Sequence, residues 1–191
     1  MWGAVSDYPV RFDVAYPEGE NRWMLLIRWL LVIPHMAVVS VLTWVADVLL
    51  TLMLFILLFT ARFPESIFGF MSGALRWQYN ATAYLMFHNR YPPFSLAGEY
   101  PPVTFEVDRQ ETYNRWLPFV KWLLVFPHVV ILAALGFAGF VVYFFVFFAV
   151  LVTGSYPRGA FDFLVGIGRW TARVSAYAWL LTDKYPPFSL H

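Results

Sequence analysis

The sequence contains no cysteine, which excludes disulfides, thiolate metal sites and cysteine nucleophiles. Charged residues are scarce, because they make up 13% of the 191 residues, whereas a soluble domain averages about 25%. The 13 basic residues nearly balance the 12 acidic ones, so the net charge of +1 gives no reason to expect nucleic acid as a partner. The chain is instead 60% hydrophobic and 21% aromatic, with a mean hydropathy of +0.60. This composition indicates a membrane protein.

The sequence also lacks the residue patterns of common catalytic sites. It contains no paired catalytic carboxylates, nucleophile–base pair, phosphate-binding loop or cluster of metal ligands. We therefore expect that the protein is not an enzyme and that it needs no cofactor.

The chain consists of two copies of one sequence pattern. Residues 29–35 read Trp-Leu-Leu-Val-Ile-Pro-His and precede an apolar run that ends at Thr60. Residues 122–128 read Trp-Leu-Leu-Val-Phe-Pro-His and precede a run that ends at Thr153. The shift is constant, since 127 − 34 = 93 and 153 − 60 = 93. We predict two tandem membrane repeats, residues 1–97 and residues 98–191.

The apolar run of the first copy, residues 29–61, is too long for one crossing of a bilayer. As a single helix its 33 residues would extend roughly 50 Å, against a hydrocarbon core of about 30 Å. We therefore predict a transmembrane helical hairpin in each repeat, four crossings in total, with Gly136 and Gly139 in the second turn and Asp47 at the apex of the first. Basic residues flank both ends of each run, which favours a cytoplasmic location for these ends and for both termini. A single crossing per repeat is the alternative, and it would place the two copies of each motif on opposite sides of the membrane.

Short strands precede the apolar runs. Residues 10–14 alternate between apolar and charged side chains, and residues 103–107 repeat this pattern. Such alternation is typical of a half-exposed strand. The two segments could pair across the repeats, although strands of five residues form only a marginal ribbon. The fold class is therefore an all-α integral membrane protein, apart from one short strand at the start of each repeat.

An amphipathic segment follows each run and leads into a proline-rich end. In the second copy, Asp162, Arg169 and Arg173 lie on one face of a helix, as expected for the lipid interface. Residues 91–96 and 185–190 both read Tyr-Pro-Pro-Phe-Ser-Leu, and we expect these closing segments to be extended and to pack over the amphipathic helix. We expect long basic side chains to reach the surface and to contact headgroups together with tryptophans. These predicted interface residues are Arg22, Arg28, Arg76, Arg115, Lys121, Arg169, Arg173, Trp77 and Trp170.

Three residues inside the apolar runs are candidates for chemistry. His35 and His128 occupy matching positions after a proline, and two imidazoles can ligate a haem or a pigment from opposite faces. The simpler interpretation is that each histidine bonds backbone released by its proline, or lies near the headgroups. Asp47 is the one acid within a run, which makes it a candidate for a proton or ion pathway. Its counterpart is Phe140, and a solvated turn would explain it equally well.

These motifs together resemble a known family. The Trp-Leu-Leu-Val-Ile-Pro-His stretch, the Thr-Gly-Ser-Tyr-Pro-Arg-Gly turn at residues 153–159 and the Tyr-Pro-Pro-Phe closure are similar to a bacterial membrane-domain family catalogued as domain of unknown function 4389. The resemblance covers nearly the whole chain as two copies, and the first copy departs from it at residues 60–66, where the glycines are lost. It implies a membrane architecture and no established activity.

The function that we predict is that of a small, non-enzymatic membrane protein, acting as a scaffold or an accessory subunit of a larger complex. Its expected partners are membrane lipids and other membrane proteins or further copies of itself, in the bacterial cytoplasmic membrane. The alternatives are a small transporter or channel component and a haem- or pigment-binding subunit. A transporter needs polar residues along a path near the midplane, and these are sparse in the second copy.

Overall fold

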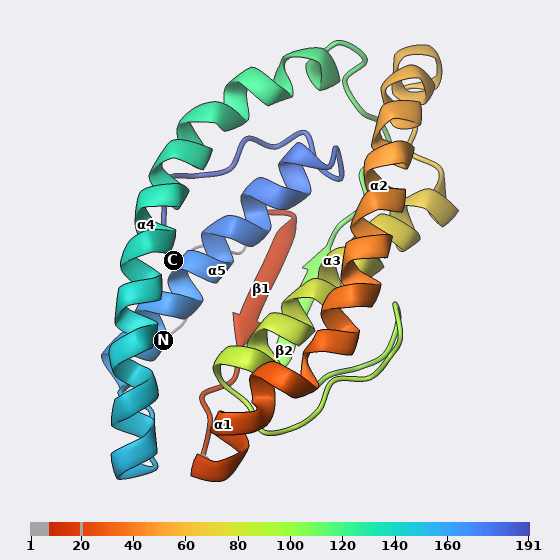
Figure 1. The fold of residues 1–191 in the computed structure, drawn as a ribbon. Coiled ribbons are helices and arrows are strands. Elements are labelled where there is room, and N and C mark those ends of the chain that lie inside the picture. Colours follow the sequence, from red (N-terminus) through yellow and green to blue (C-terminus); the bar gives the residue numbers. More distant parts are fainter. Residues whose placement is uncertain (1–7, 20) are drawn as a thin grey trace.

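The computed structural model describes residues 8–19 and 21–191, so residues 1–7 of the predicted first repeat lie outside the described part. The described chain forms two strands and five helices, and it is mostly helical as predicted. The elements in order are β1 (Val10–Val14), α1 (Arg22–Leu31), α2 (Ile33–Thr60), α3 (Glu65–Met86), β2 (Val103–Val107), α4 (Leu117–Thr153) and α5 (Arg158–Ala178) (Figure 1).

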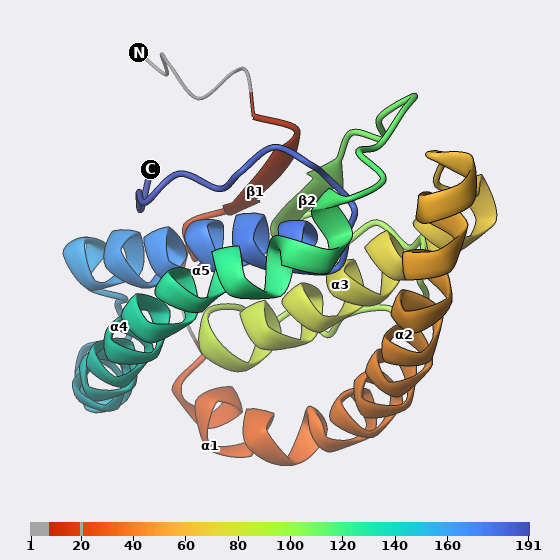
Figure 2. The ribbon, with the colours of Figure 1, turned by 90° about the horizontal axis from the view of Figure 1, so that it is seen from above.

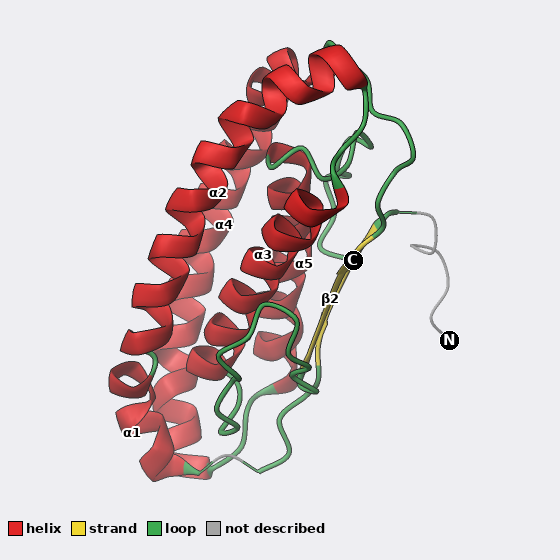
Figure 3. Ribbon diagram, turned by 90° about the vertical axis from the view of Figure 1, so that its right-hand side faces the viewer, coloured by secondary structure: helices red, strands yellow, loops and turns green. Residues whose placement is uncertain are grey.

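The elements form three layers. Figure 3 shows α2 and α4 on one side, α3 and α5 in the middle, and the two strands on the other side. Between the layers, α2 packs on α3 and α4 packs on α5, while β1 contacts α5 and β2 contacts α3. The middle helices are therefore covered on both faces, whereas α2 and α4 each have one face that no other described part of the chain covers.

The strands pair as an antiparallel ribbon, which confirms the predicted pairing across the repeats. Phe12 lies opposite Phe105, its equivalent 93 residues later, and Val10 lies opposite Val107. This register places a local two-fold axis between Phe12 and Phe105, perpendicular to the ribbon. The second repeat is thus the first one rotated by half a turn, and α2 and α4 run in opposite directions (Figure 1).

The predicted hairpins are wrong, because each apolar run continues as one helix through the expected turn. Helix α2 has 28 residues and α4 has 37. A glycine within a helix costs only about 1 kcal/mol, which is less than the loss of backbone hydrogen bonds at a turn in apolar surroundings. Gly139 instead allows close packing, since a Cβ there would lie 3.1 Å from Ile167 and 3.3 Å from Leu164 of α5. Asp47 lies halfway along α2 and not at an apex.

An asparagine and a proline at matching positions in the two copies shape the start of each long helix. They are Asn21 and Pro34 in the first copy, and Asn114 and Pro127 in the second. Asn21 caps α1 by accepting a hydrogen bond from the backbone N–H of Trp23 at 3.0 Å. Asn114, just before α4, likewise accepts a hydrogen bond from the backbone N–H of Trp116 at 2.9 Å. Proline removes one helical hydrogen bond and bends the helix. In the first repeat the helix divides into α1 and α2 just before Pro34, whereas α4 continues through Pro127 (Figure 2). Together α1 and α2 are therefore the counterpart of α4.

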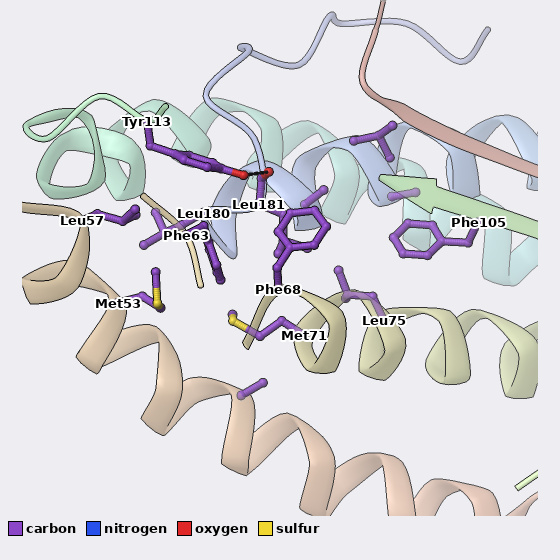
Figure 4. Close-up of a cluster of buried hydrophobic side chains, with 14 of the residues drawn as sticks. Met53, Leu57, Phe63, Phe68, Met71, Leu75, Phe105, Tyr113, Leu180 and Leu181 are labelled. Atoms are coloured by element: carbon purple, nitrogen blue, oxygen red, sulfur yellow. Dashed lines mark hydrogen bonds between the residues drawn. The ribbon is translucent and has the colours of Figure 1, made fainter. Parts of the chain in front are cut away.

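The two repeats share one hydrophobic core. Figure 4 shows Met53, Leu57 and Phe68 of the first repeat beside Leu180 and Leu181 of the second. The Tyr113 hydroxyl donates a hydrogen bond to the Leu181 carbonyl oxygen at 3.2 Å within this cluster. Because the core contains side chains from both copies, neither repeat is a separate folding unit in this structure.

Candidate functional site

The outer surface of α1, α2 and α4 is apolar. Helices α2 and α4 are long and apolar enough to cross a membrane, and only 17% and 11% of their most apolar 18-residue windows are buried in the protein. The core helix of a soluble protein would be mostly buried, because exposing large apolar side chains to water is unfavourable. We call this surface the apolar face, and the large exposed residues on it include Trp23, Trp29, Trp44, Phe55, Phe59, Trp116, Trp122, Phe126, Phe137, Phe140, Phe145 and Val152.

The opposite surface is charged. On the ribbon, Arg11 forms ion pairs with Glu106 at 3.0 Å and with Asp108 at 2.8 Å, and more than half of each side chain is exposed. Asp13 pairs with Arg169 of α5 at 2.7 Å. Such exposed pairs are stable in water but contribute little to folding. The molecule therefore has a polar side and an apolar side, separated by the α3–α5 layer.

Some of the predicted interface residues are exposed, and others are partly or fully buried in the protein. Arg22 and Arg115 are exposed at the two ends of the apolar face, where headgroup contact remains a prediction. Arg76 is half-buried and donates hydrogen bonds to the carbonyl oxygens of Leu96 and Phe105, both at 3.3 Å.

Arg28 and Lys121 do not extend to the surface as expected, because they are 1% and 2% exposed. Arg28 Nη2 donates to Asn89 Oδ1 at 2.6 Å. Lys121 Nζ pairs with Asp183 Oδ1 at 2.9 Å and donates to the Thr182 carbonyl oxygen at 2.7 Å. Burial lowers the pKa of Arg28. Asn89, which follows α3, and Asp183, which follows α5, thus bind these two charged groups. No local pattern in the sequence predicts this long-range pairing.

Arg173 is also buried, and its guanidinium donates to the carbonyl oxygens of Ser189 and of His191, the latter at 2.8 Å. It therefore fixes the end of the chain to α5. Trp77 and Trp170 are 7% and 5% exposed, so the expectation that they contact lipid is wrong. Both indoles instead face the two matched histidines.

Each histidine lies in a closed aromatic cluster. The Trp77 indole N–H donates to His35 Nδ1 at 2.8 Å, and the His35 ring stacks on Phe94 with centroids 4.0 Å apart. The second repeat matches this geometry, with 3.0 Å from Trp170 to His128 and 4.0 Å to Phe188. Both histidines are fully buried. We call these groups the histidine clusters: His35, Trp77, Tyr91 and Phe94, and His128, Trp170, Tyr185 and Phe188.

The hydrogen bond from tryptophan decides the histidine tautomer. Because Nδ1 accepts, the proton of the neutral imidazole lies on Nε2, which is buried without a partner within the described part of the chain. A histidine ligand needs a free lone pair for the metal. Each imidazole is enclosed by rings of its own repeat, so the structure adds no support for a haem shared by His35 and His128.

The histidine clusters hold the closing segments in place, which confirms their predicted packing. The Tyr91 hydroxyl donates to the Leu31 carbonyl oxygen at 3.2 Å, and the Tyr185 hydroxyl donates to that of Leu124 at 3.3 Å. These carbonyls lie three residues before each helix proline. Gly73 and Gly166 permit the close approach, since a Cβ at either would lie about 3 Å from the backbone of the closing segment. The tyrosine, and not the histidine, therefore bonds the backbone near the proline bend.

The histidine–tryptophan pair was missed by sequence reasoning. A separation of 42 residues joins His35 to Trp77 and also His128 to Trp170. This repeated separation in sequence between a histidine and a tryptophan was the signal from which the pair could have been predicted. It indicates a structural element shared by the repeats.

Asp47 is exposed on α2, and its counterpart Phe140 is also exposed on α4. The residues that the structure describes contain no group of three or more histidine, aspartate or glutamate side chains able to hold a metal ion. An open recess of about 350 Å³ lies between α3 and β2, lined by Arg76, Asn80 and Tyr100 among others. Arg173 occupies the position equivalent to Asn80 in the second repeat.

Comparison with known proteins identifies a family without assigned activity. Residues 22–96 and residues 116–189 each match the family described as Domain of unknown function (DUF4389). No curated protein and no solved structure matches the chain significantly. The two matched segments correspond to the two structural repeats described above.

Proposed function

We propose that this chain, which belongs to the DUF4389 family, is a non-enzymatic membrane protein that binds lipid through its apolar face and acts as a scaffold or accessory subunit for other membrane proteins. The observation that carries this proposal is the exposure of α2 and α4. Fully burying one large apolar side chain contributes about 1.5–3 kcal/mol. Transfer of even a few residues of the apolar face into lipid therefore contributes on the order of 10 kcal/mol.

The histidine clusters support a structural role over a catalytic one. Each histidine Nδ1 accepts a hydrogen bond from a tryptophan of its own repeat, and each tyrosine hydroxyl bonds the helix backbone. The rings of each cluster connect a helix, a proline bend and a closing segment. A catalytic histidine must instead present a nitrogen to its substrate. The surfaces, and not an internal site, are thus the functional parts that we propose.

The charged side is where a partner would bind. Once the apolar face is in lipid, the ribbon and the loops remain in water, and Arg11, Glu106 and Asp108 offer charges of both signs. A membrane protein with a soluble domain, or a second copy of the chain, fits such a surface. The bacterial cytoplasmic membrane is the location that we propose.

The test is purification from native membranes in mild detergent after washing with high salt and with alkaline carbonate. We expect the protein to resist both washes, to co-purify with other membrane proteins and to show no absorption above the aromatic band. A folded, monomeric protein that stays in solution without detergent or lipid would overturn the lipid-binding proposal. A stoichiometric haem spectrum that is lost in His35→Ala would overturn the scaffold proposal.

A charge-reversal pair provides a matched control for the partner surface. Glu106→Lys lies on the ribbon and should reduce partner recovery without changing membrane association. Glu18→Lys is also an exposed acid but lies off the ribbon, and it should leave partner recovery unchanged. Equal losses for both variants would show that the ribbon has no specific role.

A further inference from the structure

The direction of the local two-fold axis determines how equivalent residues of the two repeats are placed relative to the apolar face. The axis passes between Phe12 and Phe105, through the α3–α5 layer and toward the apolar face (Figure 3). Equivalent residues therefore lie at the same height along this axis. They lie at opposite ends of the body along the direction of α2 and α4, as α1 and the first turns of α4 do in Figure 1.

A spanning orientation would place the ribbon within the hydrocarbon. In Figure 1, β1 lies level with the middle of α4, on the other side of α5. Helices that crossed the bilayer would therefore hold Arg11 and Glu106 near its midplane. Within the described residues, the two-stranded ribbon also has two outer edges whose backbone groups pair with no further strand. Open sheet edges and exposed charges do not occur in contact with lipid chains. A single chain that spans the membrane is therefore inconsistent with its own polar side.

The lengths and the exposed side chains of the long helices are also inconsistent with a spanning orientation. Helix α4 extends about 55 Å, and it exposes apolar residues from Phe119 to Val152, beyond a hydrocarbon core of about 30 Å. At the midpoint of α2, Asp47 is exposed and forms a polar stripe with Ser40 and Thr51, spaced as on one helical face. If α2 spanned, this carboxylate would face lipid at the bilayer centre. If α2 lies along the surface, the stripe can face the headgroups.

We infer that the chain lies flat on one leaflet, with α2 and α4 parallel to the membrane plane, the two-fold axis along the membrane normal and the ribbon in water. This orientation deepens the proposed function and rests on it, because it specifies how the apolar face meets the bilayer. It places both copies of every motif at one depth, so Arg22 and Arg115 contact the same headgroup layer. The partner is a single lipid leaflet, into which the apolar face inserts by about 5–10 Å as amphipathic helices do.

The cysteine-free sequence allows a direct test with Glu18→Cys and Glu111→Cys. These exposed residues are equivalent, since 111 − 18 = 93, and they lie at opposite ends of the long helices. Each single-cysteine protein is labelled with a membrane-impermeant maleimide in sealed right-side-out and inverted bacterial vesicles. We expect both variants to react from the same side, and Thr104→Cys on the ribbon to react from that side too.

The outcomes separate the orientation from the membrane association. Val130→Cys, on the apolar face, should stay unreactive until detergent is added. Reaction of Glu18→Cys and Glu111→Cys from opposite sides would overturn the flat orientation and would show that the chain spans the bilayer. Recovery of all variants in the soluble fraction would instead refute the proposed lipid binding itself.

Discussion

Removing the positive charge of Lys121 should be among the most destabilising single changes in this protein. The Lys121 side chain is 2% exposed and pairs with Asp183, which is 16% exposed. Removing one partner of a buried ion pair costs about 3–5 kcal/mol, because the other charge stays buried without compensation. Asp183 keeps partial exposure and accepts the Asn114 backbone N–H at 2.6 Å. We therefore expect Lys121→Met to cost about 3 kcal/mol, near the lower end of this range.

The first repeat supplies the rescue variant. There the equivalent pair is Arg28 with Asn89, one charged group and one neutral amide. The double variant Lys121→Arg with Asp183→Asn reproduces that chemistry in the second repeat. We expect it to recover most of the stability that Lys121→Met loses, because no carboxylate remains unpaired.

The free energy of unfolding can be measured in detergent micelles by tryptophan fluorescence. Arg11→Met is the control, since it breaks the ion pairs with Glu106 and Asp108, in which every side chain is more than half exposed. It should cost less than about 1 kcal/mol. Equal costs for Lys121→Met and Arg11→Met would refute the argument from burial. Failure of the double variant to exceed Lys121→Met in stability would refute the equivalence of the two pairs.

Three further predictions follow from local geometry. Ala61→Gly should stabilise the protein by about 1 kcal/mol, because Ala61 has φ 53° in the left-handed region, and an unchanged unfolding midpoint would contradict this. Trp77→Phe leaves His35 Nδ1 buried without a donor and should cost about 1–3 kcal/mol in the same assay, whereas Trp44→Phe on the exposed face should cost little. Burial raises the pKa of Tyr79 to about 12, so its contribution to stability is full below about pH 10 and is lost by about 1.4 kcal/mol per pH unit between these values. Thermal midpoints of Tyr79→Phe should fall less steeply over this pH range than those of the unmodified protein.

Local patterns in the sequence predicted local structure well. The alternation at residues 10–14 and 103–107 identified the strands, and the shared shift of 93 residues identified the partner of each. The proline pairs of the closing segments correctly indicated extended chain over α3 and α5. Each of these features depends on neighbouring residues or on the repeat itself.

The errors arose where a residue depends on a distant partner. Gly136 and Gly139 are as compatible with close helix packing as with a turn, and only the position of α5 decides between them. Lys121 resembles a surface lysine at the end of an apolar run until Asp183 is placed beside it. Matching the length of each apolar run to the thickness of a bilayer also led to the wrong prediction of helical hairpins.

The pairing of Phe12 with its own equivalent Phe105 has a consequence for the origin of the chain. A polypeptide that carried one repeat would have an unpaired strand and could complete the ribbon only with a second molecule, as a symmetric homodimer. Gene duplication and fusion would then convert that dimer into a monomer without changing its shape. After fusion the two halves could diverge, which accounts for differences such as Asp47 against Phe140 and Asn80 against Arg173 on an otherwise symmetric body.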